Sequence, residues 1–146
     1  MIDEIDYKIL RILLKNSRST YVDIAREVNL SDVAVIKRIK KLENIGVIKK
    51  YSCVIDPVKL GYSKVSITGI NVDPDALLNV IENLKNKDYV KYIAITSGDH
   101  ELITIIWARD SDELMRIHRE IESLPGVRKI YPALLLDVVK DDVSFF

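Results

Sequence analysis

The apolar residues of this chain change their spacing part-way along, and that change limits the fold more than any other feature. In the N-terminal third they recur every three or four residues, the spacing of one helix face. From residue 64 onward, segments that alternate apolar and polar residues, as β-strands do, come between helical segments. We therefore expect a helical N-terminal domain followed by an α+β C-terminal domain.

Three helices are predicted in the N-terminal part. The first covers residues 3–15, where the apolar residues share one face. The second covers residues 20–28 and ends at Asn29, a residue type that tolerates the left-handed conformation of a tight turn. Ser31 is expected to cap the third helix, which continues to residue 44.

The C-terminal part repeats the order strand, helix, strand, and the two copies of about 35 residues each predict a ferredoxin-like βαββαβ domain. In that arrangement two helices cover one face of a four-stranded antiparallel sheet, and the other face is open. The predicted strand at residues 100–108 has apolar residues on both faces, so we expect a partner chain on the open face, as a dimer. We also expect Asp73 to cap the first helix of this domain, and a last strand over residues 127–139.

The predicted boundaries are a helix-turn-helix domain at residues 1–50, a linker arm at 51–63 and a second domain at 64–146. The charge of the chain agrees with this division, although 22 basic residues balance 22 acidic ones overall. Residues 1–60 hold 12 basic and 8 acidic residues, net +4, which leaves the rest of the chain at net −4. Such an asymmetry indicates two domains with different partners.

The composition excludes several classes of protein. No apolar run approaches the roughly 18–20 residues that span a bilayer, and the acidic N-terminus is unlike a signal peptide. Cys53 is the only cysteine, which excludes an intrachain disulfide and a cysteine-based zinc cluster. We expect a soluble, cytoplasmic protein with no membrane partner, no metal and no other cofactor.

The third helix is the predicted DNA-reading element, because in a helix-turn-helix this helix lies in the major groove. Its inward residues are Val35, Ile39 and Leu42, so lysines on the opposite face can pair with phosphates. The residues that we expect at the DNA are Ser31, Asp32, Val33, Ile36, Lys37, Arg38, Lys40, Lys41, Lys49 and Lys50. The alternative is that this basic face is only a solvated surface, which would not explain the apolar Val33 and Ile36 on it.

Two motifs carry a family resemblance. Leu30-Ser31 is followed by R-I-x-x-L-E-x-x-G-V-I from Arg38 to Ile48, and residues 97–102 read SGDHEL. The first motif resembles the DNA-binding half of the leucine-responsive regulatory protein/AsnC family. The second is similar to G-D-Y-D-L in that family's ligand-sensing domain. The resemblance covers almost the whole chain and implies a winged helix-turn-helix domain joined to a ferredoxin-like domain for ligand sensing and oligomerisation.

Family membership would further imply a transcription regulator that binds double-stranded DNA as dimers, which often assemble into octamers. It implies an amino-acid effector, bound where dimers meet. Successive backbone amides of Gly98, Asp99 and His100 can cradle a carboxylate, and Asp99 or Glu101 can pair with an α-ammonium group. The residues that we expect at the effector are Gly98, Asp99, His100, Glu101, Leu102, His118, Glu122 and Ala133.

This chain departs from the family pattern at His100 and Glu101, and at Ala133, near which the family often has threonine. A pocket with His, Asp and Glu favours glutamine or a basic amino acid over leucine as the effector. Two alternatives stay open: the loop is an ordinary hairpin turn, and His118 with Glu122 is an exposed surface pair.

The predicted function is sequence-specific transcription regulation in which an amino acid alters oligomeric state or DNA affinity. The main competing hypothesis is an enzyme, because a branch that resembles this family decarboxylates porphyrin precursors in haem synthesis. His100 or His118 would then be the acid. The intact, basic third helix favours the regulator. A third hypothesis, a sensing partner that does not touch DNA, fits less well because that branch usually lacks the first half.

Overall fold

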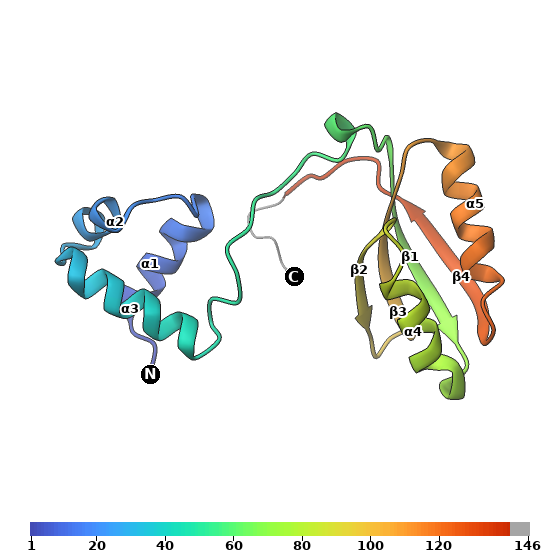
Figure 1. Cartoon of the computed structure of the whole chain (residues 1–146), viewed down its shortest axis with the longest axis horizontal. Coiled ribbons are helices and arrows are strands. Elements are labelled where there is room, and N and C mark those ends of the chain that lie inside the picture. The colour runs from blue at the N-terminus through green and yellow to red at the C-terminus, as the bar shows by residue number, and fades with distance from the viewer. Residues whose placement is uncertain (141–146) are drawn as a thin grey trace. The chain divides into compact units, whose positions relative to one another are not determined.

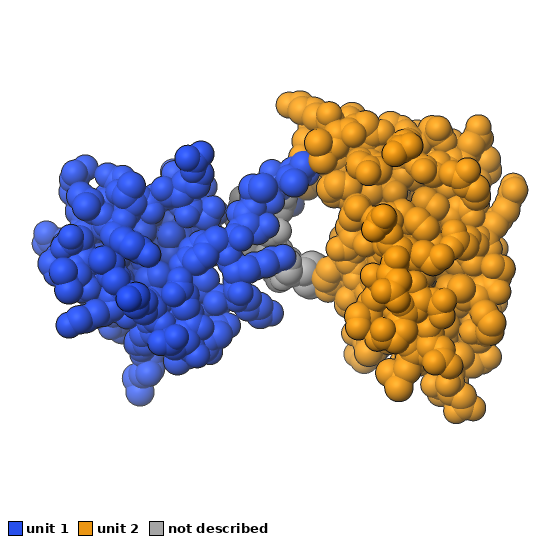
Figure 2. Space-filling model, viewed as in Figure 1, with its two compact units in different colours: residues 1–55, 140–146 blue, residues 56–139 orange. Residues whose placement is uncertain are grey.

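The computed structural model describes residues 1–140 (Figure 1). Residues 1–55 and residues 56–139 form two compact units (Figure 2), and each unit has its own core of buried apolar side chains. The predicted second domain extended to residue 146, so its end at residues 141–146 lies outside the described part of the chain.

The N-terminal unit consists of three helices: α1 (Glu4–Lys15), α2 (Tyr21–Val28) and α3 (Asp32–Asn44). Each begins after a side chain that accepts a hydrogen bond from the first helical turn, supplied by Asp3, Thr20 and Ser31. Asn29 ends α2 in a left-handed conformation with φ 57°. The helices therefore form where the apolar spacing predicted them.

One apolar core holds these helices together. Ile9 of α1, Ile24 of α2 and Ile39 of α3 are almost inaccessible to solvent. Because α3 turns Ile39 inward, the opposite side of this helix, with Lys37 and Lys40, remains exposed.

Residues 49–56 follow α3 as an extended segment that contains no strand, and the short 3-10 helix η1 (Val58–Leu60) leads from there to the sheet. Beyond η1 the first strand, β1 (Lys64–Val72), begins.

The second unit confirms the ferredoxin-like βαββαβ fold. After β1 come η2 (Pro74–Ala76), α4 (Leu77–Lys85), β2 (Val90–Ile95), β3 (Leu102–Ala108), α5 (Ser111–Glu122) and β4 (Val127–Leu134). All strand pairs are antiparallel, in the order β2-β3-β1-β4. Both α4 and α5 pack on the same face of this sheet (Figure 1).

Helices α4 and α5 cover one face of the sheet and leave the other face open. On β3, Leu102 and Ile106 turn toward the helices and are fully buried. Ile103, Ile105 and Trp107 alternate with them and lie partly exposed on the open face. The prediction of apolar side chains on both faces is confirmed.

The last strand is shorter than predicted and ends at Leu134 instead of residue 139. Leu134 pairs with Ser66, close to the first residue of β1. Beyond it the Leu135 N–H still donates to the Val65 carbonyl at 2.8 Å. The strand therefore ends because its partner strand ends.

Asp73 was predicted to cap the first helix of this domain, but its side chain accepts no capping hydrogen bond. Its backbone carbonyl accepts a hydrogen bond from the Ala76 N–H at 2.9 Å, which forms the 3-10 turn η2 ahead of α4. The Asp73 carboxylate lies 3.5 Å from Nε of Arg128 instead. An ion pair from a distant strand thus replaces the local cap.

Candidate DNA-binding surface and effector loop

The outer face of α3 presents cations without acidic partners. Lys37 and Lys40 are exposed, and neither is in an ion pair with any residue of the described chain. Beside them Val33 is 56% exposed and Ile36 is half-buried. Cations that can meet phosphates, next to apolar side chains that can meet thymine methyl groups, are what a helix needs in the major groove.

Ser31 and Asp32 stand at the N-terminal end of this helix and bond to its backbone. Ser31 Oγ accepts a hydrogen bond from the Ala34 N–H at 3.2 Å, and Asp32 Oδ1 accepts one from the Val33 N–H at 2.8 Å. Their first role in the structure is therefore to begin α3, which also orients this end of the helix.

Arg38 and Lys41 differ from the other cations of α3, because carboxylates near the start of α1 hold them. Arg38 Nη1 lies 2.7 Å from both Asp3 Oδ2 and Asp6 Oδ1, and Lys41 Nζ lies 3.1 Å from Asp6 Oδ2. Burial alone would raise the pKa of Asp6, but hydrogen bonds from Arg38 and Lys41 hold it below its usual value. These two charges are therefore balanced by carboxylates within the unit, unlike those of Lys37 and Lys40.

The start of the arm is fastened to the end of α3. The Tyr51 hydroxyl donates a hydrogen bond to Glu43 Oε1 at 2.6 Å. Burial and this bond raise the pKa of Tyr51 to about 12. Lys49 and Lys50, the exposed residues just before Tyr51, are thereby kept near the last turn of α3.

The effector loop, which we define as residues 96–101 between β2 and β3, places His100 on the open face of the sheet. The ring lies directly over Gly69, where a Cβ atom would be 2.2 Å from His100 Cδ2. His100 Nδ1 lies 2.8 Å from Asn71 Oδ1, and its ring centroid lies 4.5 Å from that of Tyr131. Sequence reasoning missed Gly69, Asn71 and Tyr131, because only the pairing of β1 with β4 brings Tyr131 beside Gly69.

The tip of this loop is exposed at Gly98 and Asp99, and Asp99 has no ion-pair partner among residues 1–140. Glu101 is engaged: it accepts hydrogen bonds from the Val72 N–H at 2.9 Å and from Arg128 Nη2 at 3.0 Å. The bond from Val72, with the charge and bond of Arg128, holds the pKa of Glu101 below its usual value. Glu101 therefore anchors the loop, whereas the Asp99 carboxylate at the tip forms no ion pair within residues 1–140.

The structure does not gather the other predicted effector residues at this loop. Leu102 is fully buried against the helices, on the other side of the sheet from the open face. His118 lies on α5, across the sheet from the open face, with Nε2 3.2 Å from Thr68 Oγ1, and burial lowers its pKa. Glu122 is exposed on the same helix, whereas Ala133 is exposed on the open face. His118 and Glu122 are therefore apart from His100 within one chain.

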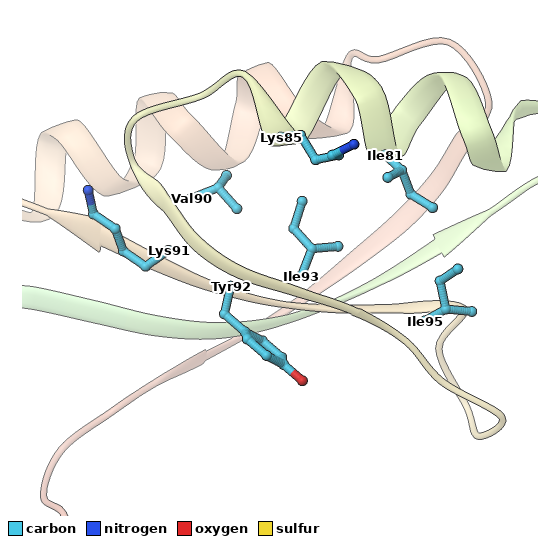
Figure 3. Close-up of a pocket in the computed structure, with 7 residues that line it drawn as sticks. All are labelled: Ile81, Lys85, Val90, Lys91, Tyr92, Ile93 and Ile95. Carbon is cyan, nitrogen blue, oxygen red and sulfur yellow. The ribbon is translucent and has the colours of Figure 1, made fainter. Parts of the chain in front are cut away.

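A cleft of about 560 Å³ runs between α4 and the edge strand β2 (Figure 3). Its lining residues are Ile81, Lys85, Val90, Lys91, Tyr92, Ile93 and Ile95. Ile93 points from the strand toward the helix, and Tyr92 points to the other side of the sheet (Figure 3). This cleft includes none of the predicted effector residues.

Two kinds of feature are absent from residues 1–140. Within them, no three His, Cys, Asp or Glu side chains are grouped so that they could hold a metal ion. No helix in this part of the chain has the length and apolar character needed to cross a membrane.

Comparison with known proteins decides the family. Residues 2–49 match the winged helix-turn-helix DNA-binding domain, and residues 65–145 match the Lrp/AsnC ligand binding domain. The chain belongs to the Lrp/AsnC family. It is 43% identical over 141 residues to the HTH-type transcriptional regulator LrpA of Pyrococcus horikoshii, covering 96% of this chain and 100% of that protein. The regulator FL11 of Pyrococcus abyssi is 31% identical over 140 residues, which cover 96% of this chain and 93% of FL11.

Solved Lrp/AsnC structures share the fold. AsnC of E. coli superimposes with a TM-score of 0.86 at 22% identity, over 96% of this chain and 95% of that one. A Neisseria meningitidis transcriptional regulator in complex with L-methionine superimposes with a TM-score of 0.89 at 21% identity. The match covers 96% of this chain and 93% of that one. This chain is thus an Lrp/AsnC-type DNA-binding transcriptional regulator with a ligand-binding domain, and not an enzyme. The decarboxylase hypothesis was wrong.

Proposed function

We propose that this Lrp/AsnC regulator reads duplex DNA with the outer face of α3, and that an amino acid controls its assembly or its DNA affinity. The observation that carries the DNA assignment is the position of Lys37 and Lys40, exposed and unpaired opposite the buried Ile39. An ordinary surface helix carries charges of both signs. On α3, the nearby carboxylate of Asp6 pairs with Arg38 and Lys41 and not with Lys37 or Lys40.

In this proposal the contacts divide by type. Lys37, Lys40 and the arm lysines Lys49 and Lys50 supply sequence-independent affinity through phosphates. Val33, near the start of α3, lies where recognition helices reach base edges, and its methyl groups suit thymine. A dimer would place two such helices in half-sites about one helical turn apart.

The open face of the sheet supports the proposal of a dimer. Ile103, Ile105 and Trp107 lie there partly exposed, together with Tyr131 from β4, which is 40% exposed. Packing this face against a second copy would remove these side chains from water, as an apolar patch of this kind requires. Further assembly of dimers, to an octamer, would follow the family expectation.

The effector proposal rests on the loop at residues 96–101. Asp99 offers an unpaired carboxylate at its tip, and His100 lies at the adjoining open face. A related Neisseria regulator was solved with L-methionine, which supports an amino acid as the class of effector. The polar groups of this loop favour glutamine or a basic amino acid over an apolar one. His118 and Glu122 would join this site only from a neighbouring subunit.

The DNA assignment is tested by changing Lys37 and Lys40 to alanine. The dependence of log K on log salt concentration should become shallower by about 0.9 for each lost phosphate contact, because fewer counterions are released. Fluorescence anisotropy with a labelled duplex, measured at several salt concentrations, gives this slope.

The matched control for this experiment is Lys59→Ala with Lys85→Ala, which removes the same charge from exposed positions of the second unit. The control should keep the wild-type slope. If the α3 variant also keeps the wild-type affinity and slope, the docking of α3 on DNA is refuted. If the wild-type protein binds no duplex even at low salt, the proposed function itself fails.

A further inference from the structure

The unpaired cations of the N-terminal unit lie on two surfaces. Residues 1–55 contain eleven Lys and Arg residues, and eight of them are in no ion pair within the described chain. Four of the eight belong to the outer face of α3 and the arm. The other four are exposed on α1 and on the turn after it: Lys8, Arg11, Lys15 and Arg18. The proposed recognition surface therefore accounts for only half of the free positive charge.

Three of these residues form a ridge on α1, which we name the α1 ridge: Lys8, Arg11 and Lys15. Residues three and four apart are neighbours on a helix surface, so these side chains stand in one row. From Lys8 to Lys15 the row is about 10 Å long at the helical rise. Arg18 follows in the next turn and is also exposed.

The α1 ridge faces away from α3. Asp6 marks the side of α1 that touches α3, because its carboxylate binds Arg38 and Lys41. At about 100° per residue, Lys8 and Lys15 lie on roughly the opposite side of α1. A straight duplex held by the outer face of α3 therefore does not reach them.

Acidic residues do not balance the charge of this ridge. Asp3 and Asp6 are used by Arg38 and Lys41, and Asp23 lies beside Arg26. Glu4, one turn before Lys8, forms no ion pair with it in the described structure. Tyr7 and Leu14 flank the row, 56% and 60% exposed. A surface that meets only water would be expected to mix both signs of charge and to carry fewer large apolar side chains.

We propose that the α1 ridge binds the phosphate backbone of a second segment of double-stranded DNA, a proposal that rests on the proposed binding of a first segment by α3. Duplex DNA carries one negative charge per about 1.7 Å of its axis, so a row of about 10 Å faces several phosphates. Arg11 can donate two parallel hydrogen bonds to one of them. Such contacts are independent of sequence and hold DNA that bends back along the protein.

The test changes Lys8, Arg11 and Lys15 to glutamine in the full chain and compares two duplexes. One is about 15 base pairs long and too short to curve, and the other is about 150 base pairs, the persistence length of DNA. On the long duplex the slope of log K against log salt should fall by up to about 2.7, about 0.9 per contact. On the short duplex, supplied below the protein concentration, the affinity and slope should match the wild type.

The control carries the same loss of charge on the second unit, as Lys59→Gln, Lys85→Gln and Arg116→Gln, all at exposed positions. It should retain the long-duplex slope, and circular dichroism should show folded protein in both variants. An unchanged slope on the long duplex refutes the proposal. Equal losses on both duplexes also refute it, because the ridge would then share the duplex held by α3. If the wild type binds neither duplex, the proposed function fails instead.

Discussion

Gly69 determines how the effector loop can lie on the sheet. It occupies the middle of β1, where glycine costs stability through its greater backbone freedom in the unfolded chain. Here its missing side chain leaves room for the His100 ring, which also contacts Tyr131 and Asn71. The position of the loop thus depends on a residue distant from it in the sequence.

The change Gly69→Ala should displace His100 from the sheet. Its methyl group would lie 2.2 Å from His100 Cδ2, so the ring or the strand has to move. We expect a loss of about 1–3 kcal/mol in the free energy of unfolding, as for overpacked sites. Chemical denaturation measures this loss, and the NMR signals of the His100 ring report its displacement.

Gly98→Ala is the matched control, because no atom of the described chain other than those of residues 97–99 lies within 4 Å of the added Cβ, and the residue belongs to the same loop. It should change the unfolding free energy and the His100 signals far less than Gly69→Ala. Equal effects of both substitutions would contradict the packing of His100 on Gly69.

Among the elements, α1 and α3 are joined by both apolar and ionic contacts. Ile9 and Ile39 share the core, while Asp6 is fully buried beside Arg38 and Lys41. A buried carboxylate is tolerated only when it is paired, as it is here by two cations. The position of the recognition helix relative to α1 therefore depends on the ionised form of Asp6.

Replacing Asp6 by asparagine should lower the free energy of unfolding by about 2 kcal/mol near neutral pH, the usual contribution of hydrogen bonds to charged groups. The folded-state pKa of Asp6 is lowered, so its contribution is present above the unfolded-state value of about 4 and is lost as pH falls through the folded-state pKa. The difference between wild type and variant should therefore shrink between pH 6 and pH 3. Urea unfolding at both pH values measures it.

Glu4→Gln serves as the control, because Glu4 is an exposed carboxylate in the same helical turn and forms no ion pair in the described structure. This variant should have nearly the wild-type stability at both pH values. If the difference in unfolding free energy between Asp6→Asn and wild type grows as the pH falls, the pairing of Asp6 with Arg38 and Lys41 is contradicted.

At the scale of the whole molecule, the two units differ in net charge and in the kind of surface that they expose. The first 60 residues are net +4 and the remainder net −4, and the open sheet face belongs to the second unit. In the proposed function, DNA meets the cationic unit, and a second copy covers the open face of the anionic one. An amino acid would act only through its different affinities for the alternative assemblies.

Sedimentation velocity tests this proposal. The protein should sediment as a dimer or a larger multiple, and one amino acid, with glutamine and the basic amino acids tested first, should shift the distribution. Asp99→Asn should abolish that shift, whereas Asp75→Asn, at an exposed position outside the loop, should retain it. A monomer under all conditions contradicts the dimer, and a distribution that no amino acid changes contradicts the effector role.

The local structure of both units could be predicted from the amino-acid sequence. Apolar residues at helical spacing place the three N-terminal helices, with Val35, Ile39 and Leu42 inward and Lys37 and Lys40 outward. The repeated strand-helix-strand order determines the ferredoxin-like sheet. Such features depend on neighbours a few residues apart, so their periodicity can be followed along the chain.

Contacts between side chains of different elements could not be predicted in this way. The helical pattern of α3 predicts Arg38 and Lys41 as further DNA contacts. In the folded unit, both form ion pairs with Asp6 of α1. His100 packs over Gly69, whereas Leu102, from the same short motif, is buried in the core. These outcomes depend on the packing of elements far apart in the chain, and periodicity within one segment carries no information about that packing.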